Sequence, residues 1–96
     1  MAKFDAGKGT MTKGISDRYF SDQLFRFFVN ISVGRHLNCD WGDVSKEDWD
    51  LNDAAVNGGS RIFSVYKRTA DEKEETIWII TEADRSATTI LFPEEY

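Results

Sequence analysis

The chain has 96 residues, of which 41% are hydrophobic and 14% aromatic, so it can form one domain with one core and is not a disordered chain. Its net charge is −5 and is unevenly distributed. Six Lys/Arg and three Asp/Glu give +3 over residues 1–39, whereas six and fourteen give −8 over residues 40–96. The thin scatter of positive charge argues against direct nucleic-acid binding and permits binding to a basic protein surface.

A single cysteine, Cys39, excludes an internal disulfide and fits a reducing cytoplasm. The sequence has no segment that resembles a signal peptide and no apolar stretch near the roughly 20 residues that cross a membrane. We therefore expect a single cytoplasmic domain over residues 1–96 without a membrane partner, in which residues 1–9 are flexible.

The N-terminal half contains the signals of one strand and one helix. Residues 10–15 are expected to form a short first strand. A helix is predicted over residues 21–33, with Ser21 as its N-cap and Gly34 as the residue that ends it. Inside this helix, the spacing i, i+3, i+4, i+7 predicts that the buried face consists of Leu24, Phe27, Phe28 and Ile31.

The C-terminal half predicts a second helix followed by three strands. The helix begins at Ser45, has Asp48 in a capping-box-like position, and ends at Gly58 and Gly59. Strands are predicted over residues 61–68, 76–82 and 88–92, and their short connections favour an antiparallel meander that ends at Pro93. The predicted fold class is therefore α+β, with two helices packed on a three- to four-stranded antiparallel sheet.

The second of these strands has apolar residues on both faces, with Ile77 and Ile79 on one side and Trp78 and Ile80 on the other. Two interpretations stay open. The strand is either central and covered on both sides, or it exposes an aromatic patch.

Residues with ligand-type side chains cluster at one place, where His36, Cys39, Asp40 and Asp43 are spaced as H-x-x-C-D-x-x-D. A zinc site usually needs four ligands, often in two pairs, and the sequence has no second Cys/His pair, so we expect no metal and no cofactor. His36 is the only histidine, and any Ser-His-Asp triad would have to use it. The simpler interpretation is a surface histidine after a helix C-terminus and a partly buried cysteine.

A second group of polar residues, Glu82, Asp84 and Arg85, lies at the corner between the last two strands. Carboxylates beside an arginine can do acid–base chemistry, but turns are the ordinary place for Asp, whose carboxylate accepts backbone N–H groups there. An enzyme or ligand-binding domain would have to bring this corner together with the first cluster, in a site formed by His36, Asp40, Asp43, Asp84 and Arg85.

The most concentrated charge lies between residues 40 and 53, where six carboxylates accompany one lysine. Such a surface could imitate phosphates toward a basic partner, with tryptophans as anchors. A solvated helix face is the alternative interpretation of the same residues. The candidate protein-binding residues are Asp40, Trp41, Asp43, Glu47, Asp48, Asp50 and Asp53.

Several parts of the chain resemble a family of short bacterial plasmid-related proteins, namely residues 35–36, 40–43, 52–53, 59–62, 78–86, 88–91 and 93–96. Many members carry the label "type I restriction endonuclease subunit M", although nothing in this sequence resembles a methyltransferase motif. Residues 11–15 are similar to another short uncharacterised family of Gram-positive bacteria. The resemblance implies a mobile-element setting, such as a plasmid or phage, and no catalytic residues.

Three functions follow as hypotheses. The first is a small acidic protein of a mobile element that inhibits a host defence complex, of the anti-CRISPR or anti-restriction type, by occupying its basic nucleic-acid-binding surface. The second is the small enzyme or ligand-binding domain described above. The third is a housekeeping module that forms a homodimer through exposed strand aromatics.

Overall fold

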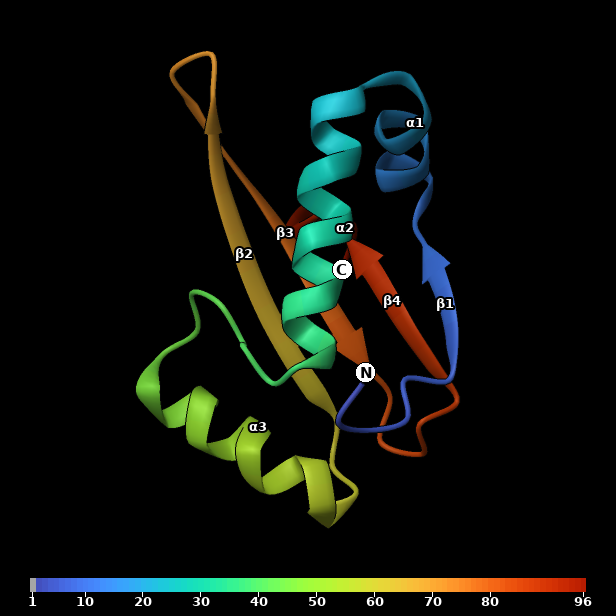
Figure 1. Cartoon of the computed structure of the whole chain (residues 1–96), viewed down its shortest axis with the longest axis vertical. Coiled ribbons are helices and arrows are strands. Elements are labelled where there is room, and N and C mark those ends of the chain that lie inside the picture. Colours follow the sequence, from blue (N-terminus) through green and yellow to red (C-terminus); the bar gives the residue numbers. More distant parts are fainter. Residues whose placement is uncertain (1) are drawn as a thin grey trace.

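The computed structural model describes residues 2–96, which form an α+β fold (Figure 1). Within this range no helix is both long enough and apolar enough to cross a membrane. The elements follow in the order β1 (Lys8–Met11), α1 (Lys13–Ser21), α2 (Gln23–Leu37), α3 (Lys46–Gly58), β2 (Ile62–Ala70), β3 (Lys73–Thr81), β4 (Ala87–Leu91) and the 3-10 turn η1 (Pro93–Glu95).

The strands form one sheet in the order β1-β4-β3-β2, in which β2, β3 and β4 make the predicted antiparallel meander. The sheet is mixed rather than purely antiparallel, because β1 pairs with β4 in parallel. The pairing of β2 with β3 also extends over more residues than predicted. Asp71 and Glu72, both with positive φ, make a tight two-residue turn of the kind that suits a hairpin, in place of a longer loop.

Helix α1 was not predicted, and the expected strand at 10–15 is instead β1, which ends at Met11. An acceptor at the other end of the chain satisfies a backbone N–H in the first turn of this helix. The N–H of Gly14 donates to the carboxylate of Glu95 over 2.9 Å, and the same carboxylate accepts the N–H of Phe92. The N-cap residue, Thr12, makes no side-chain capping hydrogen bond, and the carboxylate that takes this role lies about eighty residues away.

The helix starts are otherwise set by local caps. In α3 the Ser45 hydroxyl accepts the N–H of Asp48 over 3.1 Å, and Gly59 ends the helix in the left-handed region with φ 78°, so both predicted boundaries are confirmed. In α2 the N-cap is Asp22 rather than the predicted Ser21.

Helix α2 does not end at Gly34 as predicted, but runs on to a Schellman motif. The N–H of Cys39 donates to the carbonyl of His36 over 3.1 Å, and the N–H of Asp40 donates to the carbonyl of Arg35 over 2.9 Å. Cys39 has φ 65°, so it occupies the left-handed position where glycine is usual.

The predicted buried face of α2 is wrong. The side chains that the helix buries against the sheet are Phe25, Val29, Ser32 and His36, while Phe28 is half-buried. Leu24, Phe27 and Ile31 instead point to solvent, with exposed fractions of 69%, 54% and 64%.

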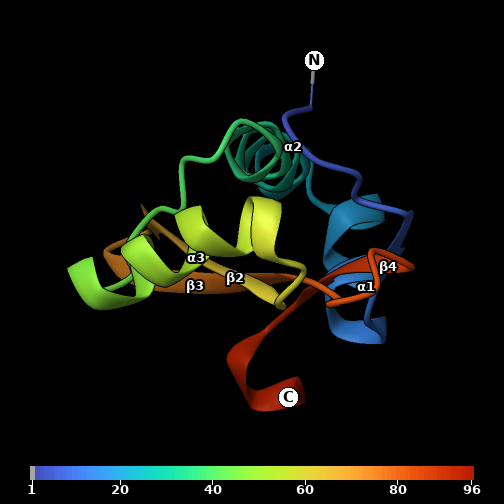
Figure 2. The same cartoon turned by 90° about the horizontal axis from the view of Figure 1, so that it is seen from below.

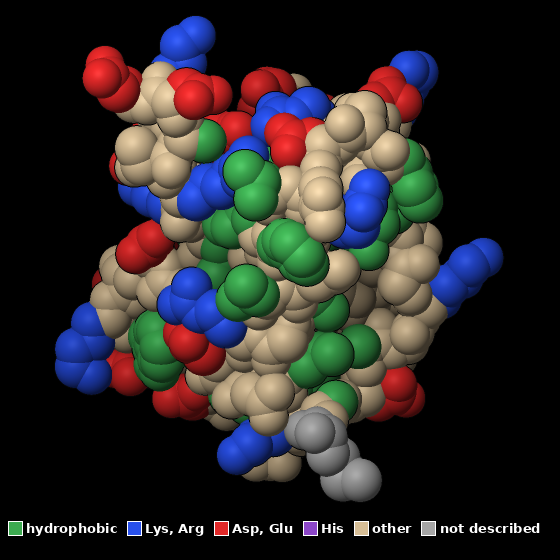
Figure 3. Space-filling view, turned by 45° about the horizontal axis from the view of Figure 1, so that its top comes forward, with side chains coloured by type: hydrophobic (Ala, Val, Ile, Leu, Met, Phe, Trp, Pro, Cys, Tyr) green, Lys and Arg blue, Asp and Glu red, His purple; other side chains and the backbone are tan. Residues whose placement is uncertain are grey.

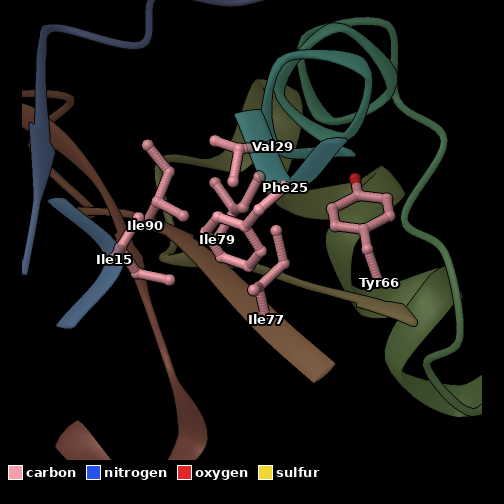
Figure 4. Packing of buried hydrophobic residues seen from close by; sticks show 7 residues of the cluster. All are labelled: Ile15, Phe25, Val29, Tyr66, Ile77, Ile79 and Ile90. Atoms are coloured by element: carbon pink, nitrogen blue, oxygen red, sulfur yellow. The ribbon is translucent and has the colours of Figure 1, made fainter. Parts of the chain in front are cut away.

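The core lies between α2 and one face of the sheet, as Figures 2 and 4 show. Its buried members are Ile15, Phe25, Val29, Tyr66, Ile77, Ile79 and Ile90. A second cluster, formed by Trp41, Ala55 and Ile62, attaches α3 beside the end of β2. The N-terminal segment, which was expected to be flexible, contacts this cluster. Phe4 packs against Trp41, and the N–H of Lys3 donates to the carbonyl of Leu37.

The outer edge of β2 is covered by polar groups of the segment before it. The side-chain amide of Asn52 accepts the N–H of Phe63 and donates to the carbonyl of the same residue, over 3.1 and 2.6 Å, as a neighbouring strand would. Further along, Gly42 forms a parallel bridge to Val65. Gly42 has φ 73°, and a Cβ there would lie 2.0 Å from the Val65 carbonyl oxygen, so the position requires glycine.

The face of the sheet opposite α2 is partly covered. Trp78 is half-buried between Phe63 and Tyr96, with ring centroids 5.1 and 5.6 Å apart, and Ile80 is buried. The C-terminal turn supplies this cover (Figure 2). The strand aromatics are therefore neither enclosed on both sides nor freely exposed.

Candidate functional site

The predicted acidic segment lies on α3 and the loop before it. Asp43, Glu47, Asp48 and Asp50 are exposed, and we refer to these four as the acidic surface. The Ser45 cap and the Asn52 amide fix α3 at its start and against β2, so Glu47, Asp48 and Asp50 project from a defined helix. Asp43 lies in the loop before it, where its N–H donates to the carbonyl of Val65 over 2.7 Å.

Some of the six carboxylates of the segment form ion pairs with a cation of the chain, and others do not. Asp40 pairs with Arg35 over 2.8 Å, and this hydrogen bond lowers the pKa of its carboxyl group. Asp50 pairs with Lys46 over 3.1 Å, as the i, i+4 spacing predicts. Within residues 2–96, no cation pairs with the carboxylates of Asp43, Glu47 or Asp48.

The structure does not place Trp41 on this surface. It is fully buried, and its indole N–H donates to Asp53 over 2.9 Å. Trp41 therefore cannot anchor a partner, and the Asp53 carboxylate is used within the fold to hold the loop against α3. The large apolar side chain that does stand beside the acidic carboxylates is Leu51, which is 61% exposed.

His36 is buried in a chain of polar side chains that runs through the core. Its Nδ1 lies 2.6 Å from the Ser64 hydroxyl and its Nε2 lies 2.9 Å from the Thr81 hydroxyl. The Thr81 and Thr88 hydroxyls are 2.7 Å apart, and Thr88 donates to the carbonyl of Ala6 over 2.7 Å. This chain of contacts connects α2 to β2, β3, β4 and the N-terminal segment.

The final carbonyl fixes the direction of the hydrogen bonds as far as Nε2 of His36, and the neutral state of the buried ring fixes the one at Nδ1. Because the carbonyl of Ala6 only accepts, Thr88 donates to it, Thr81 donates to Thr88, and Nε2–H of His36 donates to Thr81. Nδ1 of His36 is then left to accept from Ser64. The predicted surface histidine is thus a neutral core residue, and burial lowers its pKa from 6.5 to about 4.

The residues of the enzymatic hypothesis do not come together. His36 is enclosed in the core, whereas Asp84 is exposed in the β3–β4 turn, where it accepts the N–H of Ser86. Arg85 donates to backbone carbonyls, including that of Ala55 at the end of α3 over 2.5 Å. Burial raises the pKa of the Cys39 thiol, which opposes a thiolate nucleophile.

Within residues 2–96, no group of three or more His, Cys, Asp or Glu side chains has a geometry that could hold a metal ion.

A charged network that the sequence did not indicate joins α1 to the β2–β3 hairpin. Glu75 accepts from Arg18 over 2.9 Å and from Arg68 over 3.2 Å, and Arg18 also pairs with Asp22. Although burial alone would raise the pKa of Glu75, the two guanidinium groups lower it. The guanidinium of Arg18 also lies 4.5 Å from the ring centre of Phe25, so the network covers one end of the core.

The second surface feature that the sequence missed is apolar. Phe20 at the end of α1 joins Leu24, Phe27 and Ile31 on the outer face of α2, and we call these four the apolar stripe. Figure 3 shows hydrophobic side chains gathered along the middle of this face. The available signal was that α2 has apolar residues on two sides, Phe25 and Val29 on one and the stripe on the other.

Comparison with known proteins gave no similarity: no family model, curated protein or solved structure matches the chain.

Proposed function

We propose that the protein is a non-enzymatic binding protein that contacts a basic surface of another protein through its acidic surface. The observation that carries the proposal is a set of exposed carboxylates, Asp43 in the loop before α3 and Glu47 and Asp48 in its first turn, that make no ion pair within residues 2–96. Charges that make no ion pair within the fold are available to a partner, and opposite potentials on two proteins speed and orient their association.

The partner we propose is the nucleic-acid-binding surface of a host defence complex, such as a CRISPR effector or a restriction enzyme. Such surfaces are basic because they neutralise phosphates, and a helix that presents carboxylates can compete for the same site. The resemblance of residues 35–96 to plasmid-related proteins supports a mobile-element setting. Asp40, Asp50 and Asp53 contribute less directly, since each already has a partner within the chain.

The test compares the wild-type protein with a triple variant in DNA-cleavage assays that use purified CRISPR effectors and restriction enzymes. The variant is Asp43→Asn, Glu47→Gln and Asp48→Asn, which changes the net charge from −5 to −2. We expect the wild type to protect DNA from at least one nuclease, with protection that weakens as salt increases, and the variant to lose that protection.

A matched control removes the same number of charges elsewhere. Glu72, Glu82 and Glu94 are exposed, lie outside the acidic surface, and give the same net charge of −2 when all three are changed to Gln. This control is expected to protect as well as the wild type. The proposal is overturned if the wild type protects DNA from no nuclease tested, or if both triple variants lose protection equally.

A further inference from the structure

The apolar stripe is large for the surface of a small protein. Its four side chains are between 54% and 69% exposed and together leave on the order of 500 Å² of apolar surface in water, near the upper end of what single proteins carry. A cleft of about 450 Å³ opens beside it between β1, α1 and α2, bounded by Met11, Phe20 and Val33. The stripe alone supplies somewhat more than half of the roughly 800 Å² that each partner of a stable complex contributes.

The spacing of the stripe is that of a helix-packing seam. On α2, Leu24, Phe27 and Ile31 are separated by three and four positions, the alternation that places side chains on one side of a helix for packing against a second helix. Phe20 adds to the stripe from the end of α1. Gly34 continues the series three positions later, and a Cβ placed there would have no atom within 4 Å. A second helix can therefore come close to the backbone at that point.

The chemistry of this face favours a second copy of the same chain as its occupant. From Phe20 to Asn38 every exposed position is uncharged except Arg35, which pairs with Asp40 over 2.8 Å. The half-buried Arg26 is the other cation of this face; its guanidinium donates to the carbonyl of Tyr19 over 3.0 Å and makes no ion pair within residues 2–96. For a chain of net charge −5, this face without an unpaired carboxylate is the one on which two copies meet with the least repulsion. The exposed amides of Gln23 and Asn30 flank the stripe and carry both donors and acceptors, as a self-complementary rim requires, although the oxygen of Asn30 already accepts from the Tyr19 hydroxyl over 2.9 Å.

We propose that the apolar stripe is the interface of a two-fold symmetric homodimer in which the α2 helices of two copies pack antiparallel. Pairing about Phe27 sets Leu24 of one copy against Ile31 of the other, two side chains of similar volume. The interface differs from the strand aromatics, whose central member Trp78 the C-terminal turn already covers. It is also independent of the acidic surface, because the two sets share no residue.

Sedimentation equilibrium of the full chain over a range of concentrations tests the proposal. We expect a concentration-dependent mass that approaches twice 11.0 kDa. Phe27→Glu places two like charges at the two-fold axis and should raise the dimer dissociation constant by at least about 30-fold, as for a central interface residue. Leu51→Glu, an equally exposed apolar position on α3, should leave the constant unchanged.

Disulfide trapping provides a second readout that does not depend on the stability of a charged variant. In a Cys39→Gly background, Phe27→Cys should give a covalent dimer under mild oxidation because the axis brings the two thiols together, whereas Leu51→Cys should not. A wild-type chain that is a monomer at every concentration overturns the proposal. A dimer that Phe27→Glu leaves intact, or that Leu51→Cys traps as readily, overturns it as well.

Discussion

The buried histidine makes the folding stability depend on pH in a window where no other side chain of the fold interferes. His36 is neutral in the core, and burial lowers its pKa from 6.5 to about 4. In the unfolded chain the imidazole regains its ordinary pKa and takes up a proton at higher pH than the folded protein does. Acid therefore favours the unfolded state.

The size of the effect follows from the two pKa values. A difference of one pKa unit between folded and unfolded states corresponds to about 1.4 kcal/mol. The full stabilisation is present above pH 6.5 and is lost as the pH falls through about 4, with a total loss of about 3 kcal/mol, of which about 2 kcal/mol is already lost at pH 5. That is a large share of the 5–15 kcal/mol typical of a domain.

Urea unfolding at pH 7.5, 6.5, 5.5 and 5 measures this dependence. The chain has one histidine, and the carboxylates whose pKa values the fold lowers, such as Asp40 and Glu75, contribute only at more acidic pH. His36→Gln has no titrating group at this position, so its stability should be flat across the window even if it is lower throughout. In NMR spectra of the folded protein, the chemical shifts of the imidazole should stay nearly constant as the pH is lowered from 7.5 to 5.

Two results would refute this account. One is a wild-type stability that is the same at pH 7.5 and pH 5. The other is an imidazole that titrates near pH 6.5 in the folded state, which would mean that the ring is accessible to water.

Two further predictions concern backbone contacts and use urea unfolding at pH 7.5. Cys39→Gly should stabilise the protein by about 0.5–1 kcal/mol, because glycine adopts the left-handed conformation at the end of α2 without steric cost; destabilisation would show that the packing of the cysteine side chain outweighs the strain. Asn52→Ala should cost about 2–3 kcal/mol, because it leaves the N–H and carbonyl of Phe63 without their partner, whereas Asn57→Ala on the exposed face of α3 should cost little.

Local signals were sufficient wherever the stabilising group lies within a few residues. The Ser45 cap, the left-handed Gly59 and the meander of β2, β3 and β4 were all predicted from such signals. The exposure of Glu47 and Asp48 also follows from sequence, because acidic residues in the first turn of a helix are favoured by its dipole and remain in water.

Contacts between distant residues explain the failures. The carboxylate of Glu95 satisfies the start of α1, and the partners of His36 are Ser64 and Thr81, 28 and 45 residues away. The same holds within the candidate site, where Trp41 is buried because Asp53, on the next helix, accepts its N–H. A sequence pattern shows the chemical type of each side chain. It does not show which side chains make hydrogen bonds to distant residues within the fold.

Helix α2 shows how a correct pattern led to a wrong surface. Both of its sides are apolar, and the more regular spacing, through Leu24, Phe27 and Ile31, belongs to the side that the sheet leaves uncovered. A helix that is apolar all round is ordinarily buried all round. Because the sheet covers only one side of α2, the side with Leu24, Phe27 and Ile31 remains exposed in the single chain. In the proposed homodimer, a second copy of α2 would supply that cover without bringing unpaired carboxylates together.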